Sequence, residues 1–248
     1  MRAHLILDLK VLRQRDRAIY RPALVLVMLS ALSLGVFACG GGDGGGPAPI
    51  GPTPTVQLVK DINPGPNSSL PTALLAESLF FAADDGITGQ ELWKSDGTAA
   101  GTVLVKDIHP GDASSQPGFF TYVNGTLFFP ADDGVTGREL WKSDGTAAGT
   151  VLVKDINLTV FGPVGSSPSG SDISQITNIN GTLFFTADDG ITNDELWKSD
   201  GTAAGTVLVK DIHPGPTCSC PRDLTNVNGT LFFTADDGVT GRELWKFE

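Results

Sequence analysis

The sequence Glu91-Leu92-Trp93-Lys94 decides the fold, because it returns three more times, at residues 139–142, 195–198 and 243–246. The copies are separated by 48, 56 and 48 residues. A period of this size is typical of an array of equivalent supersecondary units, none of which buries its apolar surface alone. The four copies therefore predict a repeat domain, which spans residues 56–248.

Within one unit, the pattern predicts four short strands and no helix. In the second copy, the expected strands are residues 119–124, 126–131, 139–142 and 151–156. Asn124-Gly125 predicts a two-residue hairpin, because both residues accept positive φ angles. The run Leu127-Phe128-Phe129 has no polar alternation, which favours a strand buried on both faces. The sequence therefore predicts an all-β fold, a β-propeller of four-stranded blades.

The repeat begins and ends out of phase. The motif Lys-Asp-Ile also occurs four times, starting at Lys60, Lys106, Lys154 and Lys210. The first copy consists only of the last strand, 56–62, and the last copy lacks that strand. We therefore expect about four blades, with the ring closed by the N-terminal strand pairing into the last blade. A fragment of a longer array and half of an eight-bladed dimer are the competing interpretations. The expected blades are 71–108, 117–156, 172–212, and 222–247 with 56–62.

Residues 1–38 are typical of a signal peptide. Six basic residues precede an apolar run at 23–37, which is short for a transmembrane helix. The run ends in Ala38-Cys39, which resembles a bacterial lipobox and implies an acylated Cys39 at the mature N-terminus. Residues 39–55, rich in glycine and proline, are expected to form a tether. The alternatives are an uncleaved anchor and a plain secretory signal.

The leader predicts a bacterial membrane-anchored lipoprotein, extracytoplasmic, at the outer membrane or cell surface, with membrane contact through the lipid only. The net charge of the chain argues against a nucleic-acid partner. The chain has 17 basic and 28 acidic residues, and removing six basic and two acidic leader residues leaves 11 against 26, or −15. A surface this acidic repels phosphate backbones, so we expect no nucleic-acid partner.

The eight residues from Glu91 to Thr98, Glu-Leu-Trp-Lys-Ser-Asp-Gly-Thr, and the copies at Glu139 and Glu195 resemble the ELWxxDGT repeat family of bacterial exported proteins. The resemblance covers nearly all of residues 56–248. It implies a surface location and a propeller-like repeat, and it supplies no catalytic residue. The fourth copy departs from the pattern, because Phe247-Glu248 stands where the others continue with Ser-Asp.

Acidic loops are the one repeated polar constellation. Each copy has Asp-Asp-Gly followed by a glutamate, which offers the oxygen ligands that calcium prefers. The sequence therefore nominates calcium as the cofactor, with Asx turns as the alternative, in which each aspartate caps backbone amides. The candidate ligands are Asp84, Asp85, Glu91, Asp132, Asp133, Glu139, Asp188, Asp189, Glu195, Asp236, Asp237 and Glu243.

No pairing of a nucleophile with a base is visible, so we predict no catalytic residue and no enzyme. Cys218 and Cys220 lie in one loop, and the sequence shows no third and fourth ligand for a metal site there. A local disulfide or two free thiols are the favoured interpretations, and the oxidising compartment permits the disulfide. We expect a binding or scaffolding module whose variable segments between blades meet a protein or glycan ligand. The alternative is a carbohydrate-active enzyme, a glycosidase or lyase using loop carboxylates at the ring centre.

Overall fold

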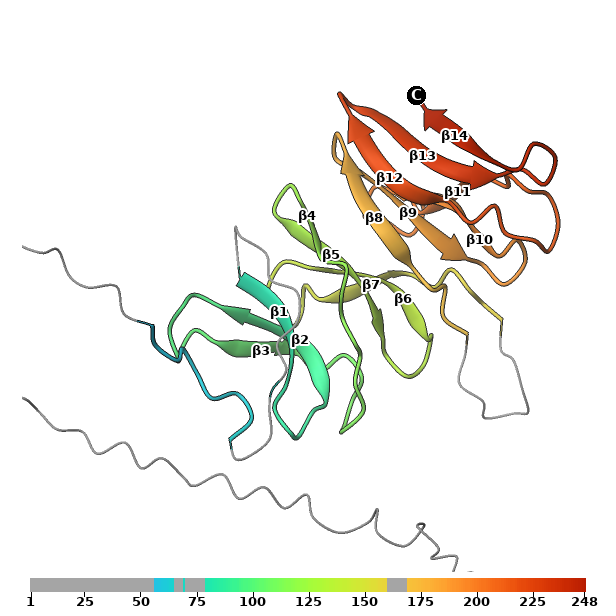
Figure 1. Cartoon of the computed structure of the whole chain (residues 1–248). Coiled ribbons are helices and arrows are strands. Elements are labelled where there is room, and N and C mark those ends of the chain that lie inside the picture. The colour runs from blue at the N-terminus through green and yellow to red at the C-terminus, as the bar shows by residue number, and fades with distance from the viewer. Residues whose placement is uncertain (1–55, 65–68, 70–78, 160–168) are drawn as a thin grey trace, which may run out of the picture. The chain divides into compact units, whose positions relative to one another are not determined.

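The computed structural model describes residues 56–64, 69, 79–159 and 169–248. The described part is all-β, with fourteen strands and no helix (Figure 1). It therefore contains no helix that could span a bilayer. The predicted signal peptide, the lipidation site Cys39 and the tether lie outside the described residues, as do the expected start of the first blade and part of the segment after Asn157.

The strands form four antiparallel sheets that follow one another along the chain (Figure 1). The first sheet contains β1 (Leu79–Asp84), β2 (Gln90–Ser95) and β3 (Val103–Lys106). The second contains β4 (Thr121–Val123), β5 (Thr126–Asp132), β6 (Arg138–Ser143) and β7 (Val151–Lys154). The third contains β8 (Ser174–Ile179), β9 (Thr182–Asp188), β10 (Asp194–Ser199) and β11 (Val207–Lys210). The fourth contains β12 (Arg222–Val227), β13 (Thr230–Asp236) and β14 (Arg242–Phe247).

Local sequence accounts for the strand boundaries. Asn124 and Gly125 have φ angles of +48° and +85°, as a tight hairpin between β4 and β5 requires. The same dipeptide joins β8 to β9 and β12 to β13 with similar angles. On the other side, the Glu-Leu-Trp strand shifts register between leucine and tryptophan where it pairs with the Lys-Asp-Ile strand. The predicted order of four strands is therefore complete in the second and third sheets, and the described residues show three strands of it in each of the other two.

The apolar core lies between consecutive sheets. The cluster between the first and second sheets contains Phe80, Leu92, Val105 and Ile108 on one side and Leu127, Phe129, Ala131 and Trp141 on the other. Equivalent clusters join the second sheet to the third and the third to the fourth. Trp93, Trp141 and Trp197 are at most 6% exposed. The second and third sheets are therefore layers whose two faces are covered by neighbouring sheets, which explains the continuous apolar strands.

Lysine side chains connect the same pairs of sheets. Lys106 Nζ donates to the Thr150 carbonyl at 2.8 Å, and Lys154 Nζ donates to the Thr206 carbonyl at the same distance. The aliphatic stems pass the next tryptophan, with Lys106 Nζ 5.3 Å from the Trp141 ring centroid. We call each such set of contacts between consecutive sheets a junction. Three complete junctions join the four described sheets.

The expected closure is not seen, because the four sheets do not close into a ring. Residues 56–62 form no strand, and β14 has no strand paired with its outer edge in the described part of the chain. Residues 56–62 lie instead against the first sheet, where Lys60 Nζ donates to the Thr102 carbonyl at 2.7 Å. The N-terminal segment therefore takes the place of a strand preceding the first sheet.

Candidate functional site

The aspartates of the Asp-Asp-Gly loops accept hydrogen bonds from backbone amides of their own loops. Asp84 Oδ1 accepts the Gly86 amide at 2.7 Å, and Asp85 Oδ1 accepts the amides of Ile87 and Thr88 at 2.9 and 2.8 Å. The other three loops repeat these contacts. The amides of the loop hold the pKa of Asp85 and Asp237 below the usual range, although burial opposes the effect. These are Asx turns, and each uses only Oδ1 of its aspartate.

The glutamates of the same motif serve another purpose in the first three sheets. Glu91, Glu139 and Glu195 have no exposed surface. Glu139 accepts the amides of Ile156 and Asn157 at 3.1 and 3.3 Å and the Ser171 hydroxyl at 2.7 Å. Those donors belong to the segment that leads into the next sheet. Each buried glutamate therefore fastens one sheet to the start of the following one, a role that the sequence analysis missed.

Burial raises the pKa of all three glutamates, for Glu139 to about 7. The amide and hydroxyl donors stabilise the ionised form and oppose that shift, and Asp155 adds to it for Glu139. The signal for this role was present in the sequence, because each glutamate directly precedes the two apolar residues Leu-Trp of its strand. It is followed by a serine 24 or 32 residues later.

The aspartates and the glutamate of one loop are not gathered in one place. Within the described residues, Asp194, Cys218 and Cys220 are the one acidic or sulfur-containing group with ligand atoms close enough for a shared ion. None of these three is a predicted calcium ligand. The predicted aspartates stand in the loop turns, Glu91, Glu139 and Glu195 stand in junctions, and Glu243 is exposed on the fourth sheet. Calcium binding by the Asp-Asp-Gly loops stays a prediction, and it concerns the Oδ2 atoms that the turns do not use.

The segments that connect consecutive sheets lie against the Asp-Asp-Gly loops and share one surface with them. Arg138 Nη1 donates to the Gln116 carbonyl at 2.5 Å, and Arg242 Nη1 donates to the Cys220 carbonyl at 3.0 Å. The Asn193 side chain likewise donates to the Pro216 carbonyl. We call the surface made by the four loops and the intersheet segments the loop face.

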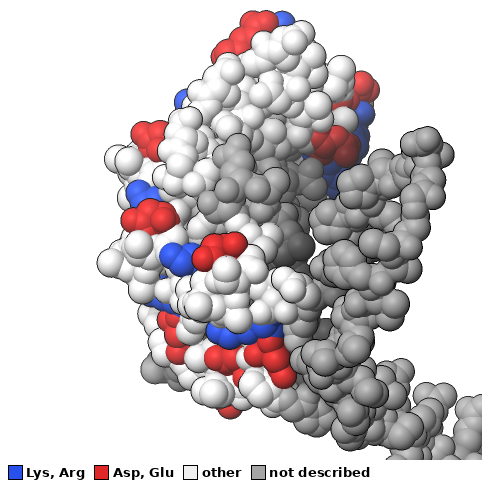
Figure 2. Space-filling model, turned by 90° about the vertical axis from the view of Figure 1, so that its left-hand side faces the viewer, with Lys and Arg blue, Asp and Glu red and all other residues white. Residues whose placement is uncertain are grey.

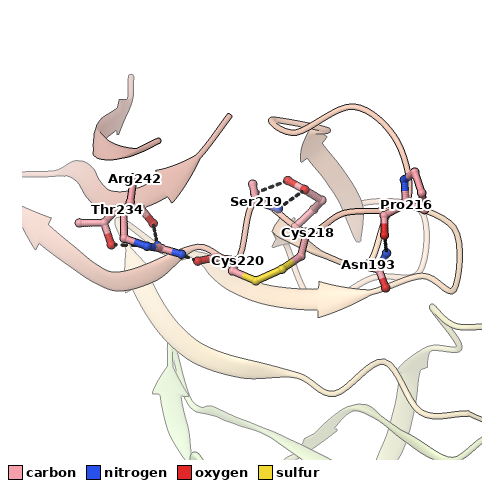
Figure 3. Close-up of a disulfide and its surroundings, with 8 residues drawn as sticks. Asn193, Pro216, Cys218, Ser219, Cys220, Thr234 and Arg242 are labelled. Carbon is pink, nitrogen blue, oxygen red and sulfur yellow. Dashed lines mark hydrogen bonds between the residues drawn. A yellow bond between two sulfur atoms is a disulfide. The ribbon is translucent and has the colours of Figure 1, made fainter. Parts of the chain in front are cut away.

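The structure joins Cys218 and Cys220 in a disulfide between the third and fourth sheets (Figure 3). Between the two cysteines, the Ser219 amide and hydroxyl donate to Glu195 at 2.7 and 2.5 Å. The disulfide therefore encloses Ser219, the residue that donates to the buried glutamate at the junction of the third and fourth sheets. Because both sulfurs are used in the bridge, they do not offer thiolate ligands to a metal.

Two polar clefts flank the disulfide loop. One, of about 270 Å³, is lined by Ser174, Gln175, Thr186, Asp194, Cys220, Pro221, Arg222 and Asp223. The other, of about 350 Å³, is lined by Asp172, Asp188, Asn193, Asp194, Pro216, Thr217 and Cys218. Burial raises the pKa of Asp194, and the charges of Asp188 and Asp172 raise it further. Asp194 is therefore an acidic group that borders both clefts.

The charges seen from one side do not form a single acidic field. In Figure 2, acidic and basic side chains lie beside one another and are separated by wide uncharged areas. The acidic excess expected for the repeat domain is thus interspersed with lysine and arginine on this face. Attraction of a cationic partner there would be local rather than long-range.

Comparisons with known proteins do not place the chain in a family. No protein-family model matches it, and no curated protein matches it. Among solved structures, it is similar to the computationally designed Ika8 protein, with 16% identity and a TM-score of 0.35, over 70% of this chain and 44% of that one. It is also similar to a chain from an analysis of two prolyl endopeptidases, with 11% identity and a TM-score of 0.40, over 68% of this chain and 24% of that one. The chain thus spans less than half of either, and likenesses this distant carry no argument about function.

Proposed function

We propose that this protein is a lipid-anchored, extracytoplasmic β-propeller of the ELWxxDGT type, which acts as a binding or scaffolding module. Each chain contributes four blades, which are the four sheets. Residues 56–62 supply the outer strand that the last blade lacks. Three junctions support this proposal, because stacked equivalent sheets are the building plan of a propeller. Each junction has an apolar cluster, a fully buried glutamate and a lysine beside the tryptophan of the next sheet.

The observation that carries the function is the contrast between a uniform scaffold and a varied loop face. The Asp-Gly-Thr turns repeat the same hydrogen bonds, at 2.8 and 2.7 Å in three copies. The residue before each motif glutamate, which touches the intersheet segment, varies between three types: Gln90, Arg138, Asp194 and Arg242. Recognition usually resides in variable loops held on a rigid frame.

The polar clefts at Asp194 are the part of the loop face best suited to a ligand. Their hydroxyl, amide and carboxylate groups fit a glycan, whose hydroxyls donate to and accept from such groups. A protein ligand is the other class that the sequence predicts. Calcium belongs to the same proposal, because the loop aspartates keep Oδ2 for a cation.

A glycan array probed with the full chain tests this assignment. Asp194→Arg should abolish binding, because it replaces the shared carboxylate of both clefts with a cation. Arginine already occupies the same position at Arg138 and Arg242, so the fold should tolerate it. Gln90→Arg is the matched control, and it should retain binding. Equal binding by wild type and Asp194→Arg would place the ligand elsewhere.

Calcium is tested by the melting temperature with calcium and with chelator. Asp132→Asn and Asp133→Asn together keep the Oδ1 acceptors of the turn and remove the charge. We expect calcium to raise the melting temperature of the wild type and not that of the double variant. A wild type that does not respond to calcium or chelator would leave these carboxylates as turn formers only.

The anchor is tested by Cys39→Ser, which removes the predicted acylation site. We expect the variant protein to leave the membrane fraction with an unchanged melting temperature, because a tether separates the lipid from the repeat domain. Full retention in the membrane fraction would show that the apolar leader is itself the anchor.

A further inference from the structure

The outer face of the fourth sheet is an uncovered copy of a surface that is buried in the other three. Leu244 is 70% exposed, whereas Leu92, Leu140 and Leu196 are at most 1% exposed. Glu243 is exposed, whereas the three equivalent glutamates are fully buried. This face, with β14 as its open edge, carries the first half of a junction. We call it the C-terminal half-junction.

The first sheet carries the second half of a junction on its opposite side. Ser69 O accepts the Asp84 amide at 3.0 Å, as Ser115 O accepts the Asp132 amide at 2.9 Å. Lys60 Nζ lies 5.8 Å from the Trp93 ring centroid, which matches Lys106 at Trp141. Residues 56–64 and Ser69, together with the outward face of the first sheet, therefore form an N-terminal half-junction.

The two halves are complementary group by group. In the first complete junction, Glu91 accepts the amides of Ile108 and His109 and both donors of Ser115. The corresponding donors of the N-terminal half are Ile62, Asn63 and Ser69, and the described hydrogen bonds bring no carboxylate to them. The corresponding carboxylate belongs to Glu243.

The apolar sides match in the same way. Phe81, Ala83 and Trp93 cluster with Ile62 and Leu79 on the first sheet, which is the second half of a junction core. Leu58 and Val59 beside them are 80% and 40% exposed. A cavity of about 260 Å³ opens here, with an apolar lining that includes Leu58, Val59, Ile62, Leu79 and Phe81. The missing first half corresponds to Phe232 and Leu244 of the fourth sheet.

The glycine of the Asp-Gly-Thr turn lies against a phenylalanine of the preceding sheet in the second and third sheets, and the first sheet lacks that contact. A Cβ on Gly201 would lie 2.9 Å from Phe128 of the preceding sheet, and one on Gly145 would lie 3.2 Å from Phe80. A Cβ on Gly97 would meet nothing within 4 Å. The phenylalanine that corresponds to Phe80 and Phe128 at this turn is Phe232.

We propose that the C-terminal half-junction of one chain binds the N-terminal half-junction of a second copy, and that the pairing is reciprocal. This rests on the proposed propeller blades, and it names the chain that supplies the missing strand. Two chains of four sheets then close one ring of eight blades, which lies within the usual range for propellers. The same surfaces meet twice about a two-fold axis, so no half-junction is left open.

A second copy fits better than the chain's own N-terminus because of the three complete junctions. These junctions join the first sheet to the fourth by similar contacts. With all three formed, the C-terminal half-junction of the chain does not meet its own N-terminal half-junction. Closure within one chain would deform junctions that are fixed by buried glutamates and close-packed clusters. Pairing between chains leaves all of them unchanged.

A cysteine pair across the new junction tests the proposal directly. Lys94 pairs with Val103 and Lys142 pairs with Val151 in the described sheets, so Lys246 should pair with Gln57. The full chain with Gln57→Cys, Lys246→Cys and Cys39→Ser is purified in mild detergent and oxidised. We expect a covalent species of twice the chain mass that is lost on reduction.

The matched control is Gln57→Cys with Lys94→Cys, which should not cross-link, because Lys94 already pairs within its own sheet. A disulfide within a single chain would contradict the pairing with a second copy, but it would support ring closure by residues 56–62. A ladder of higher masses would show an open filament and would overturn reciprocal pairing. No disulfide in either form would overturn both the pairing and the ring.

Discussion

Glu139 and Glu243 stand in the same tetrapeptide and have opposite environments. Glu139 is fully buried and accepts two backbone amides and a hydroxyl from the segment that leads into the third sheet. Glu243 is exposed on the fourth sheet, the last sheet in the described residues. The role of a repeated residue is thus completed by the next unit rather than by its own strand. Repeat arrays behave this way because each unit contacts only its neighbours.

The buried carboxylate of Glu139 has an unfavourable and a favourable effect on the free energy of folding. An isolated buried carboxylate is strongly unfavourable, and charge-assisted hydrogen bonds offset that cost. Glu139 has such donors, yet burial still raises its pKa to about 7. The junction glutamates therefore fix the register between sheets more than they add stability. Fixing the register of packed elements is the best-supported role of buried polar groups in proteins.

The largest effect is expected from the leucine that follows each glutamate. Leu140→Ala should lower the free energy of unfolding by about 2–5 kcal/mol, the usual cost of a cavity in a packed core. Chemical denaturation measures this, and the loss should be the same at every protein concentration.

Leu244→Ala is the matched variant in the fourth sheet. We expect it to act through association only, so its effect should grow with protein concentration. A large loss at high dilution would show that Leu244 is covered within a single chain.

The next largest effect concerns pH. The pKa of Glu139 is about 7 in the fold against an ordinary 4.5, so the folded chain holds a proton that the unfolded chain has released between these values. The free energy of unfolding should therefore fall as pH rises from about 4.5 to about 7, by up to about 3 kcal/mol for this group. Above that window the contribution is lost.

Glu139→Gln should flatten this dependence, as measured by denaturation at several pH values. Glu91 and Glu195 have pKa shifts in the same direction and should leave part of the slope in the variant. A slope that Glu139→Gln does not alter would contradict the raised pKa.

The smallest effect separates two identical turns. Gly201 and Gly97 have φ angles of +86° and +87°, so alanine should cost about 1–2 kcal/mol at either site. Gly201→Ala also meets Phe128 and should cost roughly 1 kcal/mol more. Thermal unfolding of both variants measures the difference. Equal costs in dilute protein would indicate that Gly97 is covered in the single chain.

Much of the fold could be predicted from the sequence. The Asn-Gly hairpins, the all-apolar strands and the strand order follow from rules that act over a few residues, and internal repetition tested each of them more than once. The candidate site was less predictable. The aspartates and glutamates of one motif were expected to share a cation, but Asp133 holds its own loop and Glu139 holds the next sheet.

The sequence by itself determined the repeat, the four-sheet organisation and the turns, because hydrophobic period and backbone preference are local properties. Only the tertiary structure decided which carboxylates are buried, where residues 56–62 lie, and which face of the fourth sheet is left uncovered. These depend on how one sheet rotates onto the next, which is set by apolar packing and by side-chain hydrogen bonds between residues 17 to 59 positions apart. Identical motifs therefore differ according to whether a following sheet covers them.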